Sequence, residues 1–156
     1  MSKIRTNRSA SRLAAVQALY EYTFGGKTLD DIGREFLTGN VGGELIEEIN
    51  EFGDERFVPV MPAEPELFSG ILACYGEKAK QIDDLIDAAL SEEWDHLEIT
   101  LRALLRAGVA ELIAFPATPV AIVITEYLDL ATAFYGDGVE VRLTNGVLDK
   151  IAKQVR

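Results

Sequence analysis

This chain of 156 residues lacks the groups that many chemical functions require. It contains a single cysteine, Cys74, and a single histidine, His96. One cysteine cannot form an internal disulfide, and together the two residues do not supply a zinc-ligand set. No apolar run reaches the length of about 18 residues that a membrane-spanning helix needs, and the basic first residues lead into no signal-peptide core. These absences predict a cytoplasmic protein without a metal or other cofactor.

The sequence also offers few residues that could act as a catalytic nucleophile or base. A nucleophilic triad needs a base with a pKa near neutrality beside its nucleophile. His96 stands at an expected helix start, where a structural or solvated role is the usual one, and Cys74 lies in an apolar helical stretch that is typical of a buried thiol. Glu126 and Arg106 lie on apolar helices, which favours structural ion pairs. With no glycine-rich phosphate loop, the sequence predicts a binding protein, with no small-molecule substrate.

Charge is distributed unevenly along the chain. The formal net charge is −11, which by itself repels nucleic acid and anionic membranes. Residues 1–12, however, carry four basic side chains and no acidic one, whereas residues 44–66 carry eight acidic side chains and only Arg56 as a base. After Glu140 the chain is again mildly basic. Basic ends on an acidic body indicate one surface for an anion and another for a basic partner.

Apolar residues recur at spacings of three and four along nearly the whole chain, and no long segment alternates with a period of two. The sequence therefore predicts an all-α fold of about six or seven helices. We expect an N-terminal helical subdomain over 1–40, an acidic connection over 41–65 and a C-terminal helical subdomain over 66–156. Ser9 or Ser11 is the expected N-cap of the first helix, and Glu44 to Phe52 could hold a further short helix.

The basic N-terminus is the feature that most directly points to nucleic acid. Arg8 and Arg12 are four residues apart, so a helix that includes both would place them on one face. Lys3 and Arg5 extend the row along a phosphate backbone, while Gln17 and Tyr20 offer hydrogen bonds and a stacking ring to unpaired bases. In the alternative interpretation this segment is a solubilising tail and Tyr20 belongs to the core.

The dipeptide Asn145-Gly146 interrupts the apolar spacing of the last expected helix. One interpretation is that Gly146 is tolerated where a neighbouring helix approaches closely, at a cost in helix propensity of ~1 kcal/mol. The other is that Asn145 exposes its amide at a binding surface. The sequence leaves both open.

Four stretches of the chain, taken together, resemble the NusB family of transcription antitermination factors. They occur in the family's order and cover both halves of the chain: Arg12–Tyr20 (RLAAVQALY), Leu104–Leu112 (LLRAGVAEL), Pro119–Tyr127 (PVAIVITEY) and Thr144–Lys150 (TNGVLDK). Departures from the family pattern include Ser9 and Ala10 where consecutive arginines are common, and Leu143-Thr144 where Phe-Val usually precedes Asn-Gly.

The resemblance implies a fold, a function and partners. NusB proteins are all-α, with two helical subdomains packed across each other. They pair with NusE, which is also a small-subunit ribosomal protein, and the pair binds the boxA element of nascent ribosomal RNA transcripts. There it helps to build a complex on RNA polymerase that resists termination.

The resemblance also implies site residues. Arg8 and Arg12 match the arginine-rich RNA-binding arm, Tyr20 matches a first-helix position linked to partner or RNA contact, and three residues fall around the C-terminal motif: Arg142, Asn145 and Lys150. Two other functions share this fold: a helical adaptor that binds only protein, and the RNA-binding domain of an RNA methyltransferase system. The chain ends at Arg156 without a Rossmann-type domain, which favours a stand-alone factor.

Overall fold

The computed structural model describes residues 7–38, 45–49, 55–58, 64–90 and 97–156. Within these ranges the chain forms six helices and one pair of strands. The helices are α1 (Asn7–Thr23), α2 (Leu29–Thr38), α3 (Pro65–Ala89), α4 (Ile99–Ala114), α5 (Val120–Tyr135) and α6 (Val139–Val155), and the strands are β1 (Leu45–Ile49) and β2 (Glu55–Val58). The prediction of an all-α fold with six or seven helices is confirmed for the main body.

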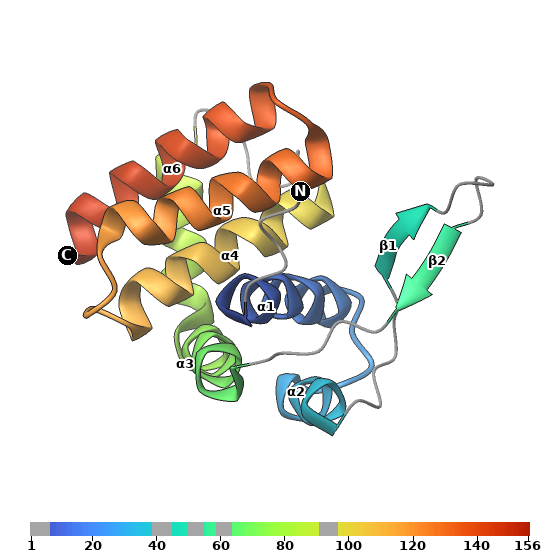
Figure 1. The fold of residues 1–156 in the computed structure, drawn as a ribbon. Helices are drawn as coiled ribbons and strands as arrows, with labels where there is room; N and C mark the ends of the chain where they lie inside the picture. The colour runs from blue at the N-terminus through green and yellow to red at the C-terminus, as the bar shows by residue number, and fades with distance from the viewer. Residues whose placement is uncertain (1–6, 39–44, 50–54, 59–63, 91–96) are drawn as a thin grey trace.

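Helix α4 lies at the centre of this body. It packs against α1, α3, α5 and α6, and its side chains from Leu101 to Leu112 are buried at nearly every position. A helix that is apolar on all sides is expected in a core position. Figure 1 shows α4, α5 and α6 side by side, with α3 passing behind them and α1 lying below α4. One continuous core cluster includes buried residues of all six helices; the division into two subdomains stays a prediction.

The helix ends show which sequence signals act locally. Thr28 caps α2, because its hydroxyl accepts from the Asp31 amide at 3.1 Å. Gly25 and Gly26 end the α1 segment with positive φ values of 76° and 88°, a conformation that glycine adopts without steric cost. Pro65 occupies the first turn of α3, where its missing amide hydrogen is no loss.

The expected helix near Glu44–Phe52 is wrong. Leu45–Ile49 pairs antiparallel with Glu55–Val58, with a register shift between Ile46 and Glu48, and the hairpin projects away from the helices in Figure 1. Two strands of five and four residues are too short for a period-two pattern to stand out. Their pairing, rather than the period, decides the conformation.

The structure shows how closely other elements approach three helical glycines. A Cβ at Gly146 would meet no atom within 4 Å, so the interpretation that a neighbouring helix crowds this position is wrong. The close approach is instead at Gly108 on α4, where a Cβ would lie 3.1 Å from Leu148. At Gly70 on α3, a Cβ would overlap the ring of Phe115.

We predict that Gly146→Ala raises the free energy of unfolding by ~0.5–1 kcal/mol, because alanine has the higher helix propensity and the site is open. Gly70→Ala is the matched control, since the same gain in propensity is opposed by overlap with Phe115. Chemical denaturation of both variants checks this. Equal shifts in the two variants would contradict the packing described for these glycines.

Candidate nucleic-acid interface

The N-terminal half of α1 places a charged side chain in the core. Arg12 is 1% exposed. Its Nε and Nη2 donate to the two carboxylate oxygens of Glu111 on α4 at 2.8 and 2.7 Å, and its Nη1 donates to Glu126 on α5 at 2.7 Å. The Tyr127 hydroxyl also donates to Glu111, at 2.9 Å. Because each charge in this buried cluster is paired and hydrogen-bonded, the helices can hold it away from water.

Burial and charge together set the protonation of the cluster. Burial alone would lower the pKa of Arg12, but the hydrogen bonds and negative charge of Glu111 outweigh it and raise that pKa. Burial raises the pKa of the Tyr127 phenol well above its usual range, and the charge of Glu111 raises it further. Arg12 therefore stays charged and Tyr127 stays neutral at physiological pH.

These contacts correct the expectation for Arg12. Its guanidinium is enclosed by α1, α4 and α5 and has no surface at which a phosphate could bind, so we remove it from the RNA-binding set. The predicted caps Ser9 and Ser11 are also wrong, since both lie inside α1. Ser9 donates its hydroxyl to Glu126 at 2.9 Å, and the Ser11 hydroxyl accepts from the Glu64 amide at 2.8 Å.

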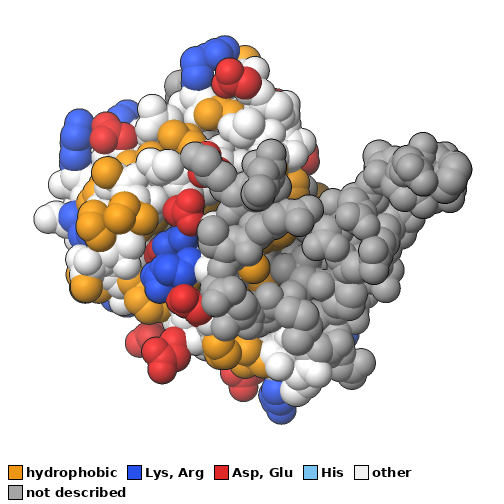
Figure 2. Space-filling model, in the orientation of Figure 1, with side chains coloured by type: hydrophobic (Ala, Val, Ile, Leu, Met, Phe, Trp, Pro, Cys, Tyr) orange, Lys and Arg blue, Asp and Glu red, His pale blue; other side chains and the backbone are white. Residues whose placement is uncertain are grey.

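Arg8 is placed differently. Its side chain is 45% exposed and pairs with Glu64, just before α3, at 2.8 Å. An exposed ion pair of this kind contributes only ~0–1 kcal/mol, so a phosphate can replace Glu64 as the partner of Arg8. On the face drawn in Figure 2, basic and acidic side chains lie close together, and the described residues there form no broad basic patch.

A polar and aromatic stripe lies along the C-terminal part of α1 and continues just past its end; we define it as the half-buried Gln17, the exposed Tyr20, and the exposed Phe24 that follows the helix. Tyr20 is 37% exposed and Phe24 is 63% exposed, and their ring centroids are 5.1 Å apart in an edge-to-face arrangement. The alternative that Tyr20 belongs to the core is therefore wrong. Gln17 Oε1 is buried without a hydrogen-bond partner among the described residues. Sequence analysis missed Phe24, although its position four residues after Tyr20 was a signal for it.

The C-terminal candidates form a second group. Arg142, Asn145 and Lys150 are all exposed on α6, while the core positions of that helix include Val147, Leu148 and Ile151. Helices α4 and α5 separate α6 from α1 in Figure 1. Asn145 is exposed, and the interpretation in which its amide faces a binding surface stays a prediction. Two further candidates, Lys3 and Arg5, lie outside the described residues, as does His96.

Glu126 and Arg106 each form an ion pair, as expected. The partner of Glu126 is Arg12, and the partner of Arg106 is Asp83. Arg106 on α4 donates its Nε to Asp83 on α3 at 2.9 Å, and Tyr75 donates its hydroxyl to the same carboxylate at 3.0 Å. The Arg106 guanidinium lies 5.1 Å from the centroid of the Tyr75 ring. These contacts join α3 to α4 on both sides of a departure from helical geometry at Lys78, so their role is structural.

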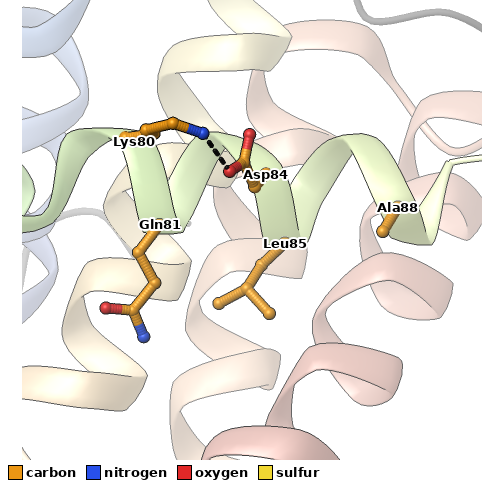
Figure 3. A pocket seen from close by; sticks show the side chains of 5 residues that line it. All are labelled: Lys80, Gln81, Asp84, Leu85 and Ala88. Carbon is orange, nitrogen blue, oxygen red and sulfur yellow. Dashed lines mark hydrogen bonds and ion pairs between the residues drawn. The ribbon is translucent and has the colours of Figure 1, made fainter.

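The described residues offer little for catalysis. The hollow along α3 in Figure 3 is lined by Lys80, Gln81, Asp84, Leu85 and Ala88. Its two charged residues pair with each other at 2.8 Å. Cys74 is buried, and burial raises the pKa of its thiol, which disfavours the reactive thiolate. In the described ranges, no group of three or more metal-ligating side chains exists, and no helix there could span a membrane.

A helical body with exposed polar, basic and aromatic side chains on α1 and α6 is typical of a binding protein. Comparison with known proteins gives its family: the chain belongs to the NusB family, whose sequence profile matches residues 9–153. The chain is 39% identical to the transcription antitermination protein NusB of Sinorhizobium fredii. The alignment covers 99% of this chain and 91% of that protein. The chain is 38% identical to the corresponding protein of Agrobacterium fabrum, covering 99% and 88% of the two chains.

Solved structures agree with this membership. The chain is 27% identical to NusB from T. maritima, with a TM-score of 0.70 and coverage of 99% of this chain and 94% of that one. A structure of the antitermination factors NusB and NusE in complex with double-stranded RNA matches at the level of the fold. It has a TM-score of 0.70, 23% identity and coverage of 95% and 97%. The predicted family and fold are confirmed, and the protein is a transcription antitermination factor rather than an enzyme.

The buried phenol of Tyr127 predicts a loss of stability at alkaline pH. Its pKa lies above the value of ~10 expected in the unfolded chain. Below about pH 9 both states keep the proton; above about pH 10 the unfolded state loses it first, so the free energy of unfolding falls. Urea titrations across this range should show the decline, with a shallower slope for Tyr127→Phe.

At neutral pH, Tyr127→Phe should also lower the free energy of unfolding by ~1 kcal/mol, because Glu111 loses a hydrogen bond. Burial likewise raises the pKa of Tyr75 and Tyr135, so part of the alkaline decline should persist. If the free energy of unfolding fell equally steeply with pH in the wild type and in Tyr127→Phe, the raised pKa of Tyr127 would be contradicted.

Proposed function

We propose that this protein acts in the cytoplasm as a partner of NusE, and that the pair binds single-stranded boxA-type RNA of nascent ribosomal RNA transcripts. In the antitermination complex on RNA polymerase, this RNA contact opposes termination. The observation that carries the proposal is the pair of exposed rings in the stripe, Tyr20 on α1 and Phe24 just after its end. In a family of antitermination factors, an exposed stripe of this chemistry suits unpaired bases.

The stripe provides what recognition of single-stranded RNA requires. Exposed rings stack on unpaired bases, with ~1–3 kcal/mol per base. Gln17 is half-buried and its Oε1 is enclosed, so the two rings carry the contact with the bases. Arg8 on the same helix supplies a phosphate contact, which adds affinity but carries no sequence information. Arg142, Asn145 and Lys150 on α6 are a second candidate contact region, reached by a longer RNA or by the complex with NusE.

The partner surface is proposed on α5 and the start of α6. Helix α5 contains no lysine or arginine, and three large apolar side chains lie exposed along this region: Ile122 at 50%, Phe134 at 37% and Val139 at 65%. Protein interfaces need an apolar centre, whereas rim charges mainly set the association rate. A basic ribosomal protein complements the acidic body, and the same exposed side chains would supply the apolar centre.

RNA titrations with and without NusE, at two salt concentrations, test the RNA part of the proposal. The protein alone should bind weakly, because acidic groups oppose phosphate, and the mixture should bind much more tightly. Arg8→Ala should reduce the salt slope by about 0.7. Tyr20→Ala should weaken binding by ~1–3 kcal/mol without changing that slope.

Tyr22→Ala is the matched control for Tyr20→Ala, because Tyr22 has the same exposed fraction of 37% but lies off the stripe. Its affinity should equal that of the wild type. A NusE complex that binds no RNA would support the alternative function of a protein-only adaptor. Equal losses for the two tyrosine variants would contradict the assignment of the stripe.

Size-exclusion chromatography tests the partner surface. A mixture with NusE should elute as one shared peak at micromolar concentration, and Ile122→Glu should separate the two proteins because it places a charge at the apolar centre. Leu37→Glu is the control, since Leu37 on α2 is 40% exposed but lies outside the proposed surface. Separate peaks for the wild type would refute the heterodimer.

A further inference from the structure

The first turns of α1 are held by three other helices through polar contacts. Ser9 and Arg12 bond to Glu126 of α5, and Arg12 bonds on its other side to Glu111 of α4. Ser11 accepts from the amide of Glu64 at the start of α3. Directional contacts from three sides fix both the position and the rotation of this end of α1.

These contacts divide the two arginines of α1 between two roles. Arg12 is enclosed and cannot touch RNA, whereas Arg8, one turn earlier, is exposed. Because both belong to the same helix, any rotation of α1 that displaces Arg12 also moves Arg8 relative to the neighbouring surface. Glu126 stands at the junction, since it contacts both Ser9 and Arg12.

The geometry points to Glu126 and Arg12 as positioning residues for RNA binding: they set the place of Arg8 without touching RNA. The inference rests on the proposed function. For the RNA affinity, this inference predicts a change opposite in sign to the one that simple electrostatics predicts. Removing an acidic group near a phosphate-binding arginine should strengthen RNA binding, whereas removing the acidic group that positions this arginine should weaken it.

The decisive experiment compares Glu126→Ala with Glu64→Ala in the complex with NusE, by titration with boxA-type single-stranded RNA. Both variants remove one negative charge near the start of α1. Glu64→Ala releases Arg8 from its exposed ion pair and should bind RNA more tightly. Glu126→Ala should bind about threefold to tenfold more weakly, the range expected when a coupling network is cut.

Glu126→Ala should keep its fold, because Arg12 retains both hydrogen-bonded oxygens of Glu111. Thermal denaturation checks this, and Ser9→Ala, which removes one of the two contacts to Glu126 without changing charge, should show a smaller loss of the same sign. A merely structural role would lower the melting temperature and leave the RNA affinity of the folded protein unchanged.

A double-mutant cycle between Glu126→Ala and Arg8→Ala completes the test. If Glu126 acts through Arg8, the two losses are not additive. Tighter or unchanged binding by Glu126→Ala, or additive losses in the cycle, would overturn the inference. Failure of the wild-type complex to bind RNA would instead overturn the proposed function, and this is seen before any variant is measured.

Discussion

The paired, buried charge of Arg12 is the interaction on which the arrangement of this protein depends. A guanidinium removed from water is tolerated only when its charge and its donors are matched. Glu111 and Glu126 provide that match from α4 and α5, so the three helices can pack in only one relative position. The apolar contacts around the cluster supply most of the burial, but they are not directional. The charged contacts determine how α1 is rotated within the body.

That rotation has consequences at the surface. With Arg12 pointing inward, the ring of Tyr20 is exposed on another side of the same helix, and Phe24 contacts it from just beyond the helix end. Arg8 lies at the edge of the body beside Glu64. A helix that serves both as a core element and as the proposed recognition surface cannot change one face without affecting the other. This accounts for an arginine-bearing helix in which one arginine is structural and the other is available for a phosphate.

The strongly acidic body is consistent with a protein that works with a partner. Among the described basic side chains, two exposed lysines pair with an acidic residue one turn away: Lys80 with Asp84 and Lys153 with Asp149. Exposed pairs of this kind contribute little to stability. They do reduce the positive potential that phosphate would otherwise meet, so a basic partner has a clear role in forming an RNA-binding complex.

The sequence by itself determined the helical class, the approximate number of helices and the family. These follow from spacings of three and four, from Thr28 and Pro65 as helix-start signals, and from four motifs within the chain. Sequence alone also identified Tyr20 and Arg8 as candidates. It could not distinguish Arg8 from Arg12, because two arginines four residues apart look the same until their partners are known.

Only the tertiary structure decided that Arg12 is core and Tyr20 is surface. The residues that bury Arg12 lie 99 and 114 positions away in the chain, and helical periodicity contains no information about such partners. The single acidic residue in the apolar stretch Leu104–Leu112 was a signal that something basic had to meet it, but not which residue. For the same reason, the sequence did not predict the strands at Leu45–Ile49 and Glu55–Val58. Pairing between segments is a property of the folded chain, whereas periodicity is a property of one segment.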